Sequence, residues 1–306
     1  MSKLLSLEEA ALMIQSGSHV SIGGFANSLS PLALVRQLIR NRVKNLEVSA
    51  MGEAVAVDML SGVGALKHVR ITNFMLEGHG RVRNFSRWVE EGRIEVEDYS
   101  HFGVTTGLFA GSVGLPFMPI KTMMGTDIEN VRSFDGEKKF KNFECPFTGE
   151  KLLLMPALTP DFGLIHVSRA DKNGNCQLYG IKSNIVEIAK ASKKVIVTAE
   201  EIVDETEIRS KHETTFLPGF FVDAVVHAPF GAHPAGMYQY YDFDKEHIAE
   251  YAKATASDES YQQYVKEYID DTKNEMGYLK KIGLKRLMDL RADFSTGISL
   301  VGRGMR

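Results

Sequence analysis

The residues best suited to acid–base chemistry lie on short loops that are rich in glycine. Glu77 and His79 stand two residues apart in the segment LEGHGR, where Gly78 and Gly80 flank the histidine. A carboxylate and an imidazole at this spacing could act as a general base pair or bind a substrate carboxylate. The alternative is that both side chains are solvated on a surface loop, and the pattern alone favours this plainer interpretation.

Glu53, His101 and His233 are further candidates for such a site. Glu53 follows Gly52, and solvent exposure is again the plainer interpretation. His233 lies in the turn PFGAHP, where a functional role and a role in packing the turn fit equally well. His166 ends an apolar segment and is expected to be a hydrogen-bonded core histidine rather than a ligand.

Other chemistries lack the sequence patterns that they need. No GxGxxG with the expected continuation follows the first strand and no GxxxxGK[ST] occurs, which argues against a nicotinamide cofactor and nucleotide hydrolysis. No GxSxG elbow supports Ser–His–Asp catalysis, and the histidines do not fall at metal-ligand spacing, so no metal is expected. A net charge of −3 offers no footprint for nucleic acid or for an anionic membrane surface.

The stretch HVSIGGFANSLSP, residues 19–31, indicates how such loops are positioned. Alternating apolar residues at its start predict a strand, and Gly23 and Gly24 then let the backbone turn and let another group come close. Ser30 before Pro31 is typical of a helix start, with serine as the N-cap and proline at the first helical position. The stretch predicts a strand, a glycine turn and a helix, an arrangement that any α/β protein needs and that could also carry a site.

The same unit repeats along the N-terminal half of the chain. Strands are expected at residues 19–22, 45–51, 68–75 and 94–100, each followed by a helical segment, and residues 118–124 could add a fifth. Alternating strands and helices predict an open, mostly parallel α/β sheet with helices on both faces. Such sheets bind ligands beyond the carboxyl ends of their strands, which gathers GGFANS, MGEA, LEGHGR and the segment around YSHFG on one side.

The C-terminal part of the chain has a different pattern. Residues 127–151 are expected to be a long surface excursion, and residues 242–290 have the pattern of amphipathic helix. We expect a single domain over residues 1–306, with 242–306 as a mainly helical C-terminal cap. The two cysteines lie far apart, the N-terminus lacks a signal-peptide pattern, and no apolar run approaches the roughly 18 residues of a membrane span. These features predict a cytoplasmic protein.

Four segments of the chain resemble signatures of the family I coenzyme A transferases. They are SGSHVSIGGFANSLSP, EVEDYS with GLPFMP, PDFGLIHVSRADKNGNCQLYG and FVDAVVHAPFGAHP. Each motif alone is weak, but four in the right order are specific. The resemblance covers almost the whole chain and is closest to the A (alpha) subunits of the glutaconate type.

This resemblance implies a reaction and a partner. In the family, the nucleophile is a glutamate that a B-type subunit contributes; it attacks the acyl-CoA thioester, and CoA then forms a thioester with this glutamate. The chain would be the A subunit of a heteromeric CoA-transferase that moves CoA between an acyl-CoA and a carboxylic acid, which could be a dicarboxylic acid. Coenzyme A would be a substrate, with no cofactor bound permanently and no catalytic nucleophile in this chain.

By the same resemblance, the glycine loop and the LEGHGR loop line the substrate site. The expected contacts to substrate or CoA are Gly23, Gly24, Phe25, Ala26, Asn27, Glu77, Gly78, His79 and Gly80, with Glu53, His101 and His233 as further candidates. Two positions depart from the family pattern. Leu29 stands where the signature has a further glycine. His79 stands where the glutaconate enzyme has a serine thought to hold the distal carboxylate, which puts glutaconate itself in question as the substrate.

Two other functions stay open at this point. Steroid ring-cleaving hydrolases on the same heteromeric scaffold use an acidic residue of the A-type chain. The matching position here is His101, which counts against hydrolysis, whereas Glu77 keeps it open. A ligand-binding regulator without enzymatic activity is the third alternative, because related folds occur in sugar-phosphate-responsive repressors. It ranks last, since no helix-turn-helix segment or basic N-terminal arm is evident.

Overall fold

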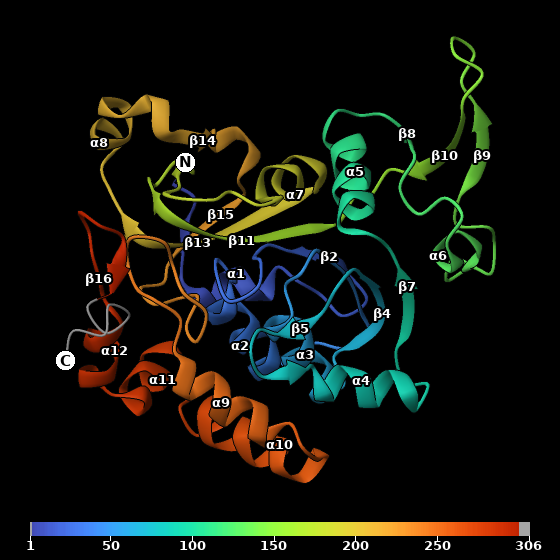
Figure 1. Cartoon of the computed structure of the whole chain (residues 1–306). Helices are drawn as coiled ribbons and strands as arrows, with labels where there is room; N and C mark the ends of the chain where they lie inside the picture. Colours follow the sequence, from blue (N-terminus) through green and yellow to red (C-terminus); the bar gives the residue numbers. More distant parts are fainter. Residues whose placement is uncertain (1, 300–306) are drawn as a thin grey trace.

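A parallel β-sheet runs through the centre of the molecule (Figure 1). The computed structural model describes residues 2–299, and the main path of this sheet consists of strands paired in parallel. In spatial order they are β1 (Leu4–Leu5), β15 (Ala224–His227), β13 (Lys194–Ile202), β11 (Phe162–Ala170), β2 (His19–Ile22), β3 (Leu46–Ala50), β4 (Leu66–Ile71) and β7 (Glu95–Asp98). Two short strands, β12 (Cys176–Gln177) and β14 (Thr215–Leu217), extend the sheet by antiparallel pairing that starts from β11.

Helices cover both faces of the sheet. The lower face in Figure 1 carries α1 (Leu7–Leu12), α2 (Leu32–Arg40), α3 (Val55–Gly62) and α4 (Arg83–Glu90). The upper face carries α5 (His101–Ser112), α7 (Ile185–Ala191) and α8 (Glu205–Ser210), and α5 and α7 pack against each other. This arrangement confirms the predicted open, mostly parallel sheet with helices on both faces.

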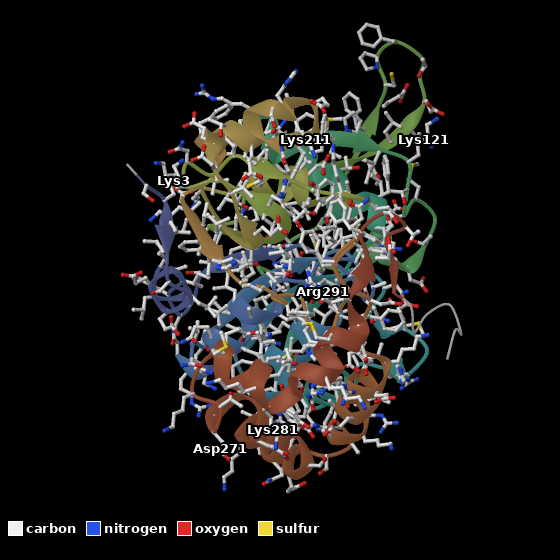
Figure 2. The ribbon with its side chains drawn as sticks, turned by 90° about the vertical axis from the view of Figure 1, so that its left-hand side faces the viewer. Lys3, Lys121, Lys211, Asp271, Lys281 and Arg291 are labelled. Carbon is white, nitrogen blue, oxygen red and sulfur yellow. The ribbon has the colours of Figure 1, made fainter. Side chains whose placement is uncertain are left out.

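The C-terminal segment adds a further helical layer beneath α2 and α3. It contains α9 (Lys245–Ala254), α10 (Asp258–Val265), a π-helical turn (Lys266–Asp270), α11 (Glu275–Ile282) and α12 (Leu284–Leu290). This layer lies at the bottom of Figure 1 and again at the bottom of Figure 2, where Asp271 and Lys281 mark it. The predicted helical C-terminal cap is therefore present.

Contacts with this layer explain why α2 has no exposed face. Every residue from 32 to 39 is buried, including Arg36, although a helix on a sheet usually keeps one polar side. The Arg36 guanidinium pairs with Glu275 and lies 3.8 Å from the ring centroid of Tyr278. One apolar core extends from α1 into the C-terminal helices, and it supports our proposal of a single domain. The ends of that predicted domain, residue 1 and residues 300–306, lie outside the described residues.

A small antiparallel sheet projects from the body of the molecule at the upper right of Figure 1. It consists of β8 (Phe117–Ile120), β10 (Lys151–Pro156) and β9 (Lys141–Glu144), in that spatial order, with α6 (Asp127–Asn130) nearby in the chain. The strand predicted at 118–124 is thus real but lies outside the main sheet, because it pairs with the strand that returns from the excursion. All four residues of β9 are exposed, as predicted for a surface excursion.

Two short hairpins complete the strands of the described chain. They are β5 (Met75–Leu76) with β6 (Gly80–Arg81), and β16 (Ala292–Asp293) with β17 (Ile298–Ser299). Among residues 2–299, no helix has the length and apolar character to cross a membrane.

Candidate active site

The candidate site lies where β2 and β3 end, at the edge of the sheet predicted to bind ligands. Ile22, the last residue of β2, pairs with Ala50, the last residue of β3, so the loops that follow them start side by side. Gly23 continues the sheet by donating its N–H to the Leu164 oxygen of β11 at 2.8 Å. The loops GGFANS and MGEA are therefore neighbours.

Gly24 occupies a position in this loop that only glycine fits. Its φ is +121°, and a Cβ there would lie 2.7 Å from Ser30 Oγ and 2.9 Å from Glu53 Cγ. The residue is buried, and its N–H has no acceptor in the described part of the chain. Buried backbone N–H groups are rarely left unpaired, so this one calls for an acceptor from outside the described chain.

Phe25 and Ala26 fasten the glycine loop to the MGEA loop. The ring of Phe25 covers Gly52, where φ is +71° and a Cβ would lie 2.8 Å from the ring. Ala26 donates its N–H to the Gly52 oxygen at 2.9 Å, and Phe25 donates to the Ser28 oxygen at 3.0 Å, which closes a tight turn. The side chain of Phe25 still exposes 42% of its surface, so it can also contact a ligand or a partner chain.

Glu53 is buried, and the expectation of a solvated side chain is wrong. Its carboxyl group has no exposed surface and accepts hydrogen bonds from Ser30 Oγ at 2.8 Å and from the Ala56 N–H at 2.9 Å. Burial raises the pKa of Glu53 to about 7, although these hydrogen bonds oppose the rise. Gly52, which has a positive φ, turns the chain just before Glu53. Glu53 lies directly before α3, where the first N–H groups of the helix have no partner within the helix and can donate to its carboxyl group.

Ser30 also differs from its predicted role as an N-cap. Pro31 holds the cap position of α2, and no side chain caps this helix. The Ser30 hydroxyl donates to Glu53 instead, and the Ala33 N–H finds its acceptor in the Gly231 oxygen at 2.8 Å. The buried carboxyl competes for the hydroxyl, while a carbonyl from a distant loop satisfies the helix N-terminus.

Leu29, where the family signature has a glycine, keeps a glycine-like backbone. Its φ is +64°, in the left-handed region, and its side chain is buried. Leu29 donates its N–H to the Gly236 oxygen at 3.0 Å, and the Gly236 N–H donates to the Asn27 oxygen at 2.7 Å. These bonds join the glycine loop to residues 236–243, a segment that the sequence patterns did not connect to the site.

A hollow of about 630 Å³ opens between the glycine loop and residues 236–243. Its lining residues are Phe25, Ala26, Asn27, Ser28, Glu77, Gly236, Met237, Tyr238, Tyr241, Asp242, Phe243 and Gly297. The volume is in the range of small-molecule sites, and aromatic rings form much of the wall. The signal in the sequence that could have found the second wall is the run of glycine and aromatic residues, GMYQYYDF, directly after the family-like turn.

The LEGHGR loop is the turn of the hairpin formed by β5 and β6. Glu77 is exposed and lines the hollow, whereas His79 is half-buried on the turn and is not part of the lining. The His79 N–H donates to the Leu76 oxygen at 2.6 Å. Gly78 and Gly80 have φ values of +77° and +87° and face open space. The structure thus brings Glu77 to the glycine loop and leaves His79 beside it.

His101 lies at the start of α5, directly after the N-cap Ser100. Its ring meets the ring of Phe25 in an edge-on contact, so it borders the glycine loop. Nδ1 of His101 is buried and has no hydrogen-bond partner among residues 2–299. Burial lowers the pKa of the imidazole, which favours the neutral ring at neutral pH.

His233 and His166 both face the interior of the protein. His233 has no exposed surface, and its ring nitrogens bond to the Tyr278 hydroxyl at 2.7 Å and to the Asp244 carboxylate at 3.0 Å. These bonds tie its turn to the C-terminal helices, and the structure does not bring His233 to the hollow. His166 is buried and bonds to Thr198 at 2.8 Å, which confirms the predicted core histidine. Within the described chain, no three His, Cys, Asp or Glu residues are grouped to hold a metal ion.

Known proteins share this chain's sequence and fold. Residues 4–228 match the coenzyme A transferase family. The chain is 35% identical to the A subunit of glutaconate CoA-transferase from Acidaminococcus fermentans over 95% of each protein. It is 32% identical to the A subunit of 3-oxoadipate CoA-transferase from Pseudomonas knackmussii over 92% of this chain and 99% of that one.

The solved structure of glutaconate coenzyme A-transferase from Acidaminococcus fermentans gives the same result in three dimensions. It superimposes with a TM-score of 0.93 and 33% identity, and the match covers 98% of both chains. The similarity therefore includes the C-terminal helices as well as the sheet. This chain belongs to the coenzyme A transferase family.

Proposed function

We propose that this chain is the A subunit of a heteromeric CoA-transferase that exchanges CoA between an acyl-CoA and a carboxylic acid. Two of its relatives, each matched over nearly the whole length of this chain, are named as A subunits of CoA-transferases, and this supports the proposal. Their named acids, glutaconate and 3-oxoadipate, each carry two carboxylates, so dicarboxylic acids are the first class to test. CoA is then a substrate, and no cofactor is bound permanently.

The proposed reaction needs a nucleophile from the B subunit. The nucleophilic glutamate of that partner attacks the acyl-CoA carbonyl carbon, which gives a mixed anhydride and releases CoA thiolate. The thiolate attacks the glutamyl carbonyl of the anhydride, so the acid leaves and CoA stays on the glutamate as a thioester. The acceptor acid then reverses the two steps. Each attack forms a tetrahedral oxyanion, which a fixed N–H donor stabilises.

Gly24 is the residue of this chain that we assign to the oxyanion. The observation that carries the assignment is its N–H, which has no acceptor in the described residues. Gly24 is buried and is not itself among the residues that line the hollow, but it directly precedes Phe25, which is. Phe25, Ala26 and Asn27 then border the acyl group. Glu77 faces the far end of the acid, presented by the turn that contains His79.

We further propose that the protein works in the cytoplasm. Cys145 and Cys176 are both free, and Cys176 is buried away from any partner thiol. Free cysteines are typical of proteins from reducing compartments.

Reconstitution with a B-type subunit tests the proposed function. The purified chain alone should show negligible CoA transfer, and mixing it with the partner should restore turnover of an acyl-CoA with an acceptor acid. Full turnover by the chain alone, shown to be free of partner by mass spectrometry, would contradict the need for a B-type partner. If the assembled complex transfers no CoA between any pair of mono- or dicarboxylic acids, the proposed reaction is wrong.

A hydrolase on the same scaffold is the second candidate, and the position of Glu77 favours it. Its exposed carboxylate lines the hollow and could activate a water molecule. The two reactions differ in their need for an acceptor: a transferase releases CoA only when an acid takes its place, whereas a hydrolase releases CoA in water alone. Steady CoA release without added acid, lost in Glu77→Gln, would select hydrolysis.

A further inference from the structure

Glu53 is a buried acid that the proposed reaction does not use directly. Its carboxyl group has no exposed surface, so it cannot touch a substrate in this structure. Ser30, which donates to it, is also without exposed surface, and the Ala56 N–H ties it to the first turn of α3. Burying an acid is costly even when it is hydrogen-bonded, so its place directly beside the glycine loop calls for an explanation.

The contacts of Gly24 supply that explanation. The three atoms nearest to the place of a Gly24 Cβ are Ser30 Oγ at 2.7 Å, Glu53 Cγ at 2.9 Å and Ser30 Cα at 3.1 Å. All three belong to the hydrogen-bonded pair. The loop is also attached by hydrogen bonds on both sides of Gly24, through the Gly23 N–H to Leu164 and through the N–H groups of Ala26 and Leu29. The backbone of Gly24 therefore rests on Ser30 and Glu53.

We propose that Glu53 is a positioning residue for CoA transfer: together with Ser30 it fixes the Gly24 backbone and thereby the place of its unpaired N–H. The inference rests on the proposed function, in which this N–H binds the oxyanion. A continuous set of contacts runs from the first turn of α3 through Glu53 and Ser30 to Gly24. The helix thereby gives the loop a rigid support.

Removing this support should reduce turnover more than binding. In Glu53→Ala, the space beneath Gly24 opens and its N–H can move, and a misplacement of about 1 Å costs about 100-fold in rate. Because the oxyanion exists only in the transition state, kcat should fall while the KM values for acyl-CoA and acid stay within about 3-fold. Glu53→Gln fills the same volume and keeps an oxygen for Ser30, so it should retain at least about a tenth of kcat.

Asp58 provides a matched control from the same helix. It too has no exposed surface, and it accepts hydrogen bonds from the Phe85 N–H at 2.8 Å and the Tyr251 hydroxyl at 2.7 Å. Burial raises its pKa as well. Asp58 is not among the atoms that touch Gly24, so Asp58→Ala removes a buried acid from α3 without removing the support of the loop.

The experiment compares Glu53→Ala, Glu53→Gln and Asp58→Ala in complex with the B subunit. Thermal melting and co-elution report folding and assembly, kcat and KM report transfer, and hydrogen–deuterium exchange of peptides covering residues 23–30 reports the loop. We expect Glu53→Ala alone to lose about 100-fold in kcat and to speed exchange in residues 23–30, while Asp58→Ala lowers the melting temperature and stays within about 3-fold in kcat.

Three results would overturn the inference. They are an assembled Glu53→Ala complex within about 3-fold of wild-type kcat, equal losses of kcat in Glu53→Ala and Asp58→Ala, and unchanged exchange of the loop. If Glu53→Ala does not assemble, Ser30→Ala removes the same hydrogen bond and decides the question by the same criteria. A wild-type complex without CoA transfer would refute the proposed function instead, and the exchange data would still decide whether Glu53 fixes the loop.

Discussion

The ring of Phe25 meets the ring of His101 edge-on, with centroids 5.7 Å apart and planes at 73°. This contact joins the glycine loop after β2 to the N-terminus of α5. Helix α5 follows β7, the last strand on the main path of the sheet. Nδ1 of His101 is buried without a partner in the described residues, and buried polar atoms usually have one. We infer that Nδ1 bonds to substrate or to the B subunit in the active complex.

His101→Phe tests this inference, because it keeps the ring contact with Phe25 and removes Nδ1. The loss of a hydrogen bond to a buried polar group should lower kcat/KM by about 5- to 150-fold, which corresponds to roughly 1 to 3 kcal/mol. His212→Phe is the control, since His212 lies exposed in a surface turn. If His101→Phe matches the control, the imidazole serves only as a packing surface.

Gly24→Val should leave the sheet folded and remove most of the acyl transfer. The branched side chain would have to adopt a φ of +121° and would overlap Ser30 and Glu53, so the loop must shift. We expect the reconstituted enzyme to lose about 100-fold in kcat. Activity is measured alongside circular dichroism and partner binding.

Gly92→Val is the matched control for this change. Gly92 also has a positive φ, +70°, but a Cβ there meets nothing within 4 Å. Gly92→Val therefore introduces the backbone strain of a positive φ without the steric overlap that Gly24→Val adds. Equal activity of both variants would mean that the glycine pair is only a turn and that the site is elsewhere.

The local patterns of the sequence predicted the framework of the site well. The alternation in residues 19–22 and the following glycine pair are short-range signals, and they placed β2 and the loop after it correctly. The side of the sheet on which Glu77 meets the glycine loop followed from the general geometry of parallel sheets. These features depend on neighbours in the chain or on rules shared by all α/β folds.

The features that the sequence did not reveal depend on contacts between distant segments. Ser30 looked like an N-cap because serine before proline is common there, but its partner Glu53 comes from another strand–helix connection. Residues 236–243 reach the site through Gly236, whose bonds to Asn27 and Leu29 span most of the chain. No periodicity of one segment reports such pairings, so tertiary structure was needed to find them.

Glu77→Gln should change the ranking of acceptor acids more than His79→Ser does. Glu77 lines the hollow, whereas His79 lies on the turn outside the lining. A carboxylate at this place repels a second carboxylate of the acid and accepts hydrogen bonds from a hydroxyl there, so its removal should change kcat/KM for dicarboxylic acids by about 5- to 150-fold relative to the others. Both variants are assayed across a panel of mono- and dicarboxylic acids with the reconstituted enzyme.

Glu213→Gln, at an exposed glutamate far along the chain, controls for the charge change. An unchanged ranking of acids in Glu77→Gln would remove Glu77 from the acyl site. A larger effect from His79→Ser than from Glu77→Gln would mean that the turn rearranges when substrate binds. Loss of turnover with every acid in Glu77→Gln would make Glu77 catalytic, and loss of acid-independent CoA release in the same variant would favour hydrolysis.

The buried carboxyl of Glu53 should make the protein less stable as the pH rises toward neutrality. Burial raises its pKa from 4.5 to about 7, so between these values the folded state holds a proton that the unfolded state has released. Stability falls with pH wherever the folded state binds more protons. The contribution is fully present below about pH 4.5, and about 3 kcal/mol of it is lost by pH 7 to 8.

Urea unfolding of the wild-type chain and Glu53→Gln at pH 5, 6, 7 and 8 measures this contribution. The amide does not titrate, so the free energy of unfolding of Glu53→Gln relative to the wild type should rise by about 2 to 3 kcal/mol across the series. Asp58→Asn is the control, because burial raises the pKa of Asp58 only to about 6. The difference in free energy of unfolding between Asp58→Asn and the wild type should therefore level off about one pH unit lower than that of Glu53→Gln. Parallel pH curves for Glu53→Gln and the wild type would show that the carboxyl stays ionised or gains water in solution, and that the enclosed pair of Ser30 and Glu53 does not persist.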